Sequence, residues 1–132
     1  MWKKSEFYKP ESKKFFNALS SSTASGARQR GLIYALCPED IMFLYMHQNG
    51  RCALTGEKMV LKRGVSGNME VAKVSVDRID QTANYTIENV QLVCQIANIA
   101  RNVLTIEQFE NLCLVVARYV LERRYKDELA QT

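Results

Sequence analysis

The stretch SVDRIDQTANYTIENVQLVCQIAN, residues 75–98, decides how the rest of the chain is interpreted. Val74 and Val76 alternate with polar residues just before DRID, a pattern that indicates a β-strand. Thr86 is a good N-cap, and apolar residues at helical spacing follow it, so we predict a helix over about 87–103. Those apolar positions are Val90, Val93, Cys94 and Ala97. A strand, a polar turn and a helix therefore bring Asp, Arg and Asn side chains into one short unit.

The composition indicates one soluble domain. The chain has 132 residues, of which 47% are hydrophobic, and no apolar run approaches the roughly 18 residues that cross a bilayer. The opening MWKKSEFYKP is basic and lacks the continuous apolar segment of a secretory signal. We therefore expect an intracellular, cytoplasmic protein with no membrane partner. The net charge of +4 allows a polyanionic partner without requiring one.

Turn-forming residues divide the N-terminal half of the chain. Residues 1–26 place lysines among aromatic residues and end in the turn-rich SSSTASG, which predicts a basic arm and a short helix. Residues 27–132 are predicted to form a single compact domain. A short strand over 32–36 is expected next, and then a helix that begins at Cys37-Pro38-Glu39-Asp40 and ends at Asn49-Gly50.

Two further segments complete the predicted order. A basic loop or hairpin over 57–68 precedes the central strand. Thr105 to Gln108 resembles a capping box, which opens a last helix that runs to about Asp127. Its apolar stripe is predicted to be core, and comprises Phe109, Leu112, Cys113, Val116 and Val120. The apolar face over 109–121 is half open, and it therefore also allows a homodimer through this helix.

Several motifs in one order resemble the HNH endonucleases, which are also called ββα-metal or His-Me finger nucleases. They are QNGRCALTG, SVDRID and NYTIENVQLVC, followed by the Ala-Asn that ends at Asn98, with ARQRGLIYALCPEDI upstream. The likeness covers about residues 27–109 and is greatest to small nucleases of phages and mobile elements, which act in the host cell. It implies an α+β fold with a ββα-metal core and flanking helices, here including a long C-terminal helix.

The resemblance also implies roles for individual residues. Asp77 matches the metal-binding member of the pair at the strand end, and Arg78 occupies the place of the general base. Asn89 matches the Asn that braces the loop, and Asn98 stands where the family's last His binds the metal. Arg101 matches a lysine near the bound phosphate. The implied cofactor is one divalent cation, Mg²⁺ or Mn²⁺, because carboxylate and amide oxygens suit hard cations.

Both outer His residues of the H-N-H trio are replaced in this chain. With a pKa above about 12, Arg78 cannot accept a proton near neutral pH, so we expect it to bind the scissile phosphate or to steady charge in the transition state. Asp80 is a second metal ligand, a water activator, or a residue that shapes the turn. His47, the only His in the sequence, lies outside the motif and is interpreted as an ordinary helical residue.

The cysteines do not form the zinc-binding pairs that many HNH proteins carry. Thr55 stands where the partner of Cys52 would be, and Ala97 stands where the partner of Cys94 would be. Two thiolates do not complete a tetrahedral site, so no structural zinc is expected. Cys52 and Cys94 are predicted to pack together as small apolar groups.

These observations predict a metal-dependent DNA endonuclease that hydrolyses phosphodiester bonds, nicking or cutting double-stranded DNA. The residues expected to contact DNA phosphates are Arg28, Arg30, Lys62, Arg63 and Arg101. The alternative is a catalytically inactive DNA-binding protein that retains the HNH fold, which the missing His residues favour. The combined presence of the polar residues at 77, 80, 89, 98 and 101 favours the nuclease. A third interpretation is an α+β protein whose DRID loop is only structural.

Overall fold

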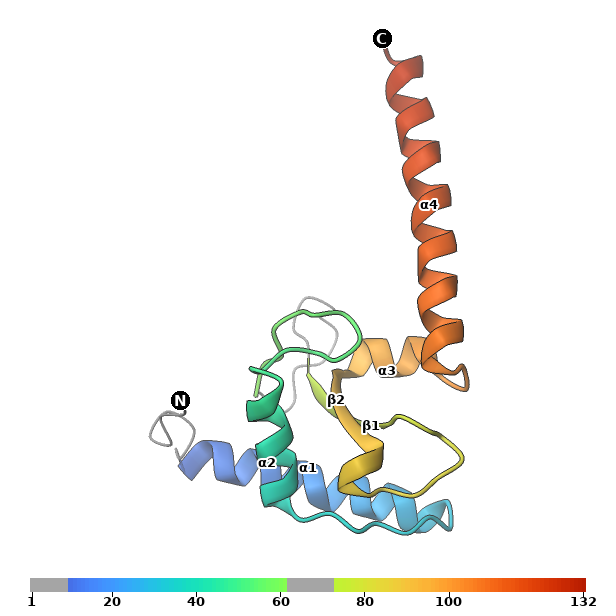
Figure 1. Cartoon of the computed structure of the whole chain (residues 1–132). Helices are drawn as coiled ribbons and strands as arrows, with labels where there is room; N and C mark the ends of the chain where they lie inside the picture. The colour runs from blue at the N-terminus through green and yellow to red at the C-terminus, as the bar shows by residue number, and fades with distance from the viewer. Residues whose placement is uncertain (1–9, 62–72) are drawn as a thin grey trace. The chain divides into compact units, whose positions relative to one another are not determined.

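The computed structural model describes residues 10–61 and 73–132, in which helices and two strands are combined. In chain order the elements are α1 (Pro10–Gln29), α2 (Pro38–His47), β1 (Val74–Arg78), the 3-10 turn η1 (Ile87–Asn89), β2 (Val90–Cys94), α3 (Gln95–Arg101) and α4 (Ile106–Ala130) (Figure 1). The chain divides into two compact units, residues 1–100 and 101–132, and each is described by itself. The predicted α+β class is confirmed at this level.

Helix α1 continues through the segment where the sequence predicted a break. The SSSTASG segment is helical, and the hydroxyls of Ser22 and Thr23 donate to the Leu19 carbonyl at 3.1 and 2.7 Å. Such bonds to the preceding turn let hydroxyl residues sit inside a helix. Phe16 and Ala27 are completely buried at either side of this segment, so core packing holds the helix straight through it. The predicted turn at 20–26 is therefore wrong, and α1 spans the predicted division at residue 26.

Helix α2 agrees with its prediction, whereas the segment before it does not form a full strand. The Cys37 N–H donates to Asp40 Oδ2 at 2.9 Å, which caps the first turn. At the other end Asn49 and Gly50 have positive φ values of 54° and 68°, the left-handed conformation that ends helices. The predicted strand over 32–36 is reduced to an isolated bridge between Tyr34 and Tyr85.

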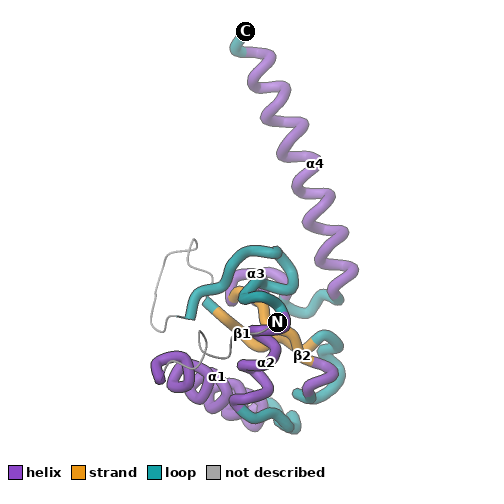
Figure 2. Tube along the Cα trace, turned by 60° about the vertical axis from the view of Figure 1, so that its left-hand side comes forward, coloured by secondary structure: helices purple, strands orange, loops and turns teal. Residues whose placement is uncertain are grey.

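The central unit is an antiparallel hairpin followed by a short helix (Figure 2). β1 pairs with β2 in a register that sets Asp77 opposite Gln91. The predicted helix over 87–103 is wrong in its first half, because η1 and β2 occupy residues 87–94. Thr86 precedes η1, but its side chain makes no capping hydrogen bond there. Only the second half is helical, as α3.

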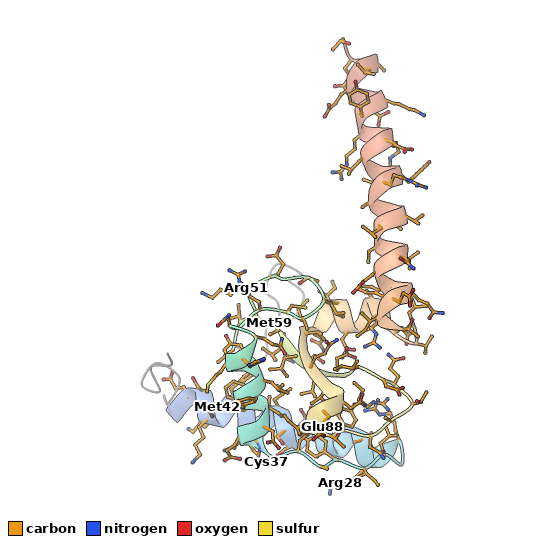
Figure 3. The ribbon with its side chains drawn as sticks, in the orientation of Figure 1. Arg28, Cys37, Met42, Arg51, Met59 and Glu88 are labelled. Carbon is orange, nitrogen blue, oxygen red and sulfur yellow. The ribbon has the colours of Figure 1, made fainter. Side chains whose placement is uncertain are left out.

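The outer edge of β2 is held by the segment that follows α2. Gln48 Nε2 donates to the Leu92 carbonyl at 2.8 Å, and the Leu92 N–H donates to Gln48 Oε1 at 2.9 Å. The Ala53 N–H also donates to the Leu92 carbonyl, at 3.0 Å. Met59, labelled in Figure 3, is only 1% exposed, and its burial in the core holds this segment in place. β2 therefore has hydrogen-bonding partners on both of its edges.

One face of the hairpin carries much of the core of the first unit, and Val93 on the other face is also fully buried in it. Alternation along the two strands places the same-face side chains of Val74, Val76, Val90, Leu92 and Cys94 together, and all are at most 6% exposed. Helix α2 packs against β2 and α1 packs against α2. Burying these apolar side chains supplies the main stabilisation of the unit.

Helix α4 forms most of the second unit, and most of its residues are exposed. The Gln108 N–H donates to Thr105 Oγ1 at 3.1 Å and the Thr105 N–H donates to Gln108 Oε1 at 3.0 Å, which confirms the capping box. No residue of α4 is buried. The predicted core stripe is therefore wrong, since Leu112 and Val116 are 50% and 52% exposed.

Two sequence predictions lie partly outside the described residues. The basic loop over 57–68 is described only as far as residue 61, where Lys58 forms an isolated bridge with Arg51. Lys62 and Arg63, which were predicted to contact DNA phosphates, fall in the segment that is not described. Within residues 10–61 and 73–132, no helix is both long and apolar enough to cross a membrane.

Candidate metal and phosphate site

Asp77 lies near the end of β1, on the hairpin face opposite Val76 and Leu92. Side chains alternate along a strand, so Asp77 shares its face with Ser75 and, across the hairpin, with Gln91 and Val93. Asp77 is 3% exposed, and its Oδ2 accepts a hydrogen bond from Gln91 Nε2 at 3.0 Å. Gln91 was not singled out from the sequence, although the register of a hairpin makes the facing residue a natural neighbour.

Asn98 on α3 is directed to the same face of the hairpin. Its Nδ2 donates to Ser75 Oγ at 2.9 Å, and Ser75 precedes Asp77 by one strand repeat, about 7 Å. A carboxylate on β1 and an amide on α3 therefore lie on one side of the strand pair. The two residues predicted to bind metal thus share one face of the hairpin, with Asn98 beside Ser75 and Asp77 one strand repeat further along β1.

Arg78 points to the other face of the hairpin, away from the Asp77 side. Its register partner is Val90, which is 3% exposed. Arg78 Nη1 donates to the carbonyls of Gln81 and Ala83, each at 2.8 Å. The guanidinium also lies over the ring of Tyr85, 5.2 Å from its centroid. Arg78 is therefore a clamp on the 79–85 loop in this structure, a role that the sequence interpretation did not include.

Tyr85 completes this clamp from the end of the loop. It is 5% exposed, and Arg30 Nη2 donates to its hydroxyl at 2.7 Å. Arg30 and Arg78 both approach its ring, at 5.8 and 5.2 Å from the centroid. Part of the guanidinium of Arg30, predicted to contact DNA, is therefore already used to hold the loop.

Asn89 ties the two ends of the same loop together. Its Oδ1 accepts from the Asp80 N–H at 2.9 Å, while its Nδ2 donates to the carbonyls of Asp80 and Asn84 at 3.0 and 2.9 Å. The Ile79 N–H donates to the Asn89 carbonyl at 2.8 Å. These are the contacts of the loop brace that the family resemblance implies. A role of Asn89 in catalysis stays a prediction.

Asp80 makes the contacts of a turn residue. Its Oδ1 accepts from the Thr82 N–H at 2.9 Å and from Thr82 Oγ1 at 2.6 Å, which forms an Asx turn. The hydrogen bonds from Thr82, side chain first and then backbone, together with the nearby positive charge of Arg78, lower the pKa of the Asp80 carboxyl. Its side chain is exposed and ionised at neutral pH. Of the three roles considered for Asp80, turn shaping is the one with observed contacts.

The remaining basic residues differ in accessibility. Arg28 is exposed near the end of α1 (Figure 3). Arg101 ends α3, is 1% exposed, and its Nε donates to the Leu104 carbonyl at 3.0 Å. This burial corrects the expectation of an accessible phosphate contact at Arg101. Cys94, which was predicted to lie on the same helix as Arg101, is in β2 instead.

Cys52 and Cys94 pack together, as predicted. The Cys94 N–H donates to Cys52 Sγ at 3.2 Å, and both residues are buried. Burial raises the pKa of the Cys52 thiol, but hydrogen bonds from Thr55 and from the backbone of Cys94, Leu54 and Thr55 outweigh this and lower it. Burial raises the pKa of the Cys94 thiol. The CALTG segment is thus folded around a sulfur that accepts several hydrogen bonds.

Other candidate ligands do not gather in the described part of the chain. Within residues 10–61 and 73–132, no three side chains of His, Cys, Asp or Glu come together as a metal site. His47 is exposed on α2 and stacks on Phe43, with ring centroids 5.8 Å apart. Comparison of the chain with protein-family models, curated proteins and solved structures finds no match. The candidate site is therefore interpreted from its own geometry and chemistry.

Proposed function

We propose that this protein is a metal-dependent DNA endonuclease of the HNH type. The observation that supports this proposal best is the placement of Asp77 and Asn98 on one face of the hairpin, where Asn98 donates to Ser75 of the same strand. The order of β1, β2 and α3 is the one expected of a ββα-metal unit. The Asn89 brace between the strands fixes the loop beside it.

The donor set suits a hard divalent cation, Mg²⁺ or Mn²⁺. Both side chains offer oxygen, a carboxylate from Asp77 and an amide oxygen from Asn98, whose nitrogen is used by Ser75. A cation held there would neutralise charge on the phosphodiester and lower the pKa of a water molecule. Gln91 orients the Asp77 carboxylate, and Ser75 orients the Asn98 amide. In this proposal Asp80, an ionised and exposed carboxylate, accepts the proton of the attacking water.

DNA is the proposed substrate because several basic residues precede the site in the sequence. Arg28 is exposed, and Arg51 is exposed in the segment after α2. Such residues bind phosphates rather than base edges, so the affinity should fall steeply with salt and depend little on sequence. The proposed setting is intracellular, where the substrate is found, and a phage or mobile element is the proposed origin.

A second candidate function is DNA binding without hydrolysis. The contacts of Arg78 favour it, because a guanidinium that donates to the Gln81 and Ala83 carbonyls is engaged in holding the loop. Asp80 likewise gives its Oδ1 to Thr82. In this candidate the hairpin and helix serve only as a scaffold for a basic surface.

Nicking of supercoiled plasmid by the purified full chain distinguishes these candidates. The parent is incubated with Mg²⁺ or Mn²⁺ beside Asp77→Asn and Asn98→Ala. Asp127→Asn and Asn111→Ala are matched controls, because both residues are exposed on α4 and distant in sequence from the motif. Circular dichroism confirms that each variant is folded. Calorimetric titration with Mn²⁺ measures cation binding without reference to turnover.

The proposal predicts nicking by the parent and by both controls, with a loss of more than about tenfold in the two site variants, since even the residues that only support a metal ligand contribute about 10- to 100-fold. Weaker Mn²⁺ binding by the same two variants is expected. Salt-dependent DNA retention with no nicking by the parent would select the second candidate. Neither nicking nor DNA retention would leave only a structural role for the loop.

A further inference from the structure

Helix α4 exposes an unusually long apolar surface. Every residue over 112–121 except Arg118 is apolar, and none is buried. Adjacent valines at 115 and 116 are 56% and 52% exposed, and Leu121 is 65% exposed. A stretch of helix that is apolar nearly all round is normally covered by protein. At 25 residues, α4 is about 37 Å long, enough for several turns of helix pairing.

We propose that α4 pairs with the α4 helix of a second copy of this chain, in antiparallel orientation. Phe109, Cys113, Val116 and Val120 follow one another at alternating spacings of four and three residues. This is the spacing of the seam between two paired helices. Cys113 and Val116 on this seam are exposed, and Phe109 and Val120 are partly exposed.

The charges that flank the seam define the partner and its direction. Glu110 and Arg124 are two heptads apart, so they occupy the same position beside the seam. In an antiparallel pair centred on Ala117, Glu110 of each copy lies level with Arg124 of the other. In a parallel pair a residue at this position faces the partner's residue five places earlier, so Glu110 would lie beside Thr105 and Arg124 beside Tyr119, and these ion pairs would not form. Two symmetric ion pairs, and opposed helix dipoles, therefore favour the antiparallel arrangement of identical helices.

Sedimentation velocity on the full chain tests this pairing in the absence of DNA and divalent cations. The protein is examined from about 1 to about 100 µM, a range that covers micromolar dissociation constants. Val116→Lys lies on the seam and should give a monomer at every concentration. Val115→Lys is the matched control, because the neighbouring valine is similarly exposed but points away from the seam. Circular dichroism should show the same helix content in both variants.

A charge exchange tests the direction of the pairing. Glu110→Arg and Arg124→Glu should each weaken the dimer by roughly tenfold, because each creates two like-charge contacts, and the double variant should restore it. A parent that is monomeric throughout overturns the proposal, as do equal effects of the two lysine variants or failure of the double variant to recover. Since dimerisation is measured without substrate, its failure leaves the nuclease proposal unaffected, and loss of nicking alone leaves the dimer unaffected.

Discussion

Replacing Arg78 by Ala should destabilise the first unit, because its side chain joins the end of β1 to the following loop. Arg78 Nη1 donates to two carbonyls at 2.8 Å, and the guanidinium lies 5.2 Å from the centre of the Tyr85 ring. Hydrogen bonds from a charged donor contribute about 1.5 to 3 kcal/mol each, and a cation–π contact contributes about 0.5 to 1 kcal/mol at an exposed site. Because Arg78 is only half-buried, we take the lower values.

The expected loss for Arg78→Ala is about 3.5 kcal/mol in the free energy of unfolding, or roughly 10 °C in Tm for a domain of this size. Arg78→Lys keeps the charge but not the planar fork, so about half of that loss is expected. The control is Arg28→Ala, an exposed arginine that should change stability by less than about 0.5 kcal/mol. Guanidinium chloride unfolding followed by circular dichroism gives all three values.

Two results would refute the conclusion that Arg78 holds the 79–85 loop in place. One is equal stability of Arg78→Ala and Arg28→Ala. The other is an Arg78→Lys protein of full stability whose nicking of plasmid is lost, since that pattern belongs to a residue that contacts phosphate. Faster amide hydrogen exchange over residues 79–85 in Arg78→Ala should accompany the loss of stability, because the loop would lose an anchor.

Three further outcomes follow from the loop and turn geometry. Asn89→Ala removes three hydrogen bonds to the loop backbone and should cost about 1 to 3 kcal/mol by urea unfolding; a change below about 0.5 kcal/mol would contradict the brace. The folded pKa of Asp80 is lowered, so its carboxylate stabilises the fold above its unfolded pKa of about 3.9 and loses this effect as the pH falls through the folded value. The stability difference between the parent and Asp80→Asn should therefore be present at neutral pH and vanish in acid, and a difference independent of pH would argue against it. Gly50→Ala should cost more than Gly31→Ala in thermal unfolding, because both glycines have positive φ but only at Gly50 would a Cβ meet Tyr45 Oη, at 3.0 Å; equal costs would remove the steric argument.

The sequence predicted the hairpin's first strand, but it could not separate the second strand from a helix. Val90, Leu92 and Cys94 share a face at a spacing of two, while Val90, Val93 and Ala97 fit a helix equally well. The apolar run from Val90 to Ala97 is too short for its spacing to distinguish a strand from a helix. Pairing with β1 makes residues 90–94 a strand. In α1, similarly, turn-prone serines are overridden by the burial of Phe16 and Ala27.

The site was predicted in part. The common face of Asp77 and Asn98 and the contacts of Asn89 agree with the sequence interpretation. Arg78 was grouped with Asp77, although neighbours on a strand point to opposite faces, and that signal was available from the strand assignment. The burial of Arg101 had no local signal, because nothing in the pattern of a short helix indicates what surrounds its last residue.

The clamp at Arg78 sets a constraint on reengineering the site. In the proposed HNH function a histidine would be expected at this position as the proton acceptor, but an imidazole is too short to replace the guanidinium that donates to Gln81 and Ala83. An Arg78→His exchange alone would thus install a base and release the loop that must position it. Gain of the histidine would need a compensating change that rigidifies residues 79–85 first, so the order in which the two substitutions are introduced determines whether the intermediate protein stays folded.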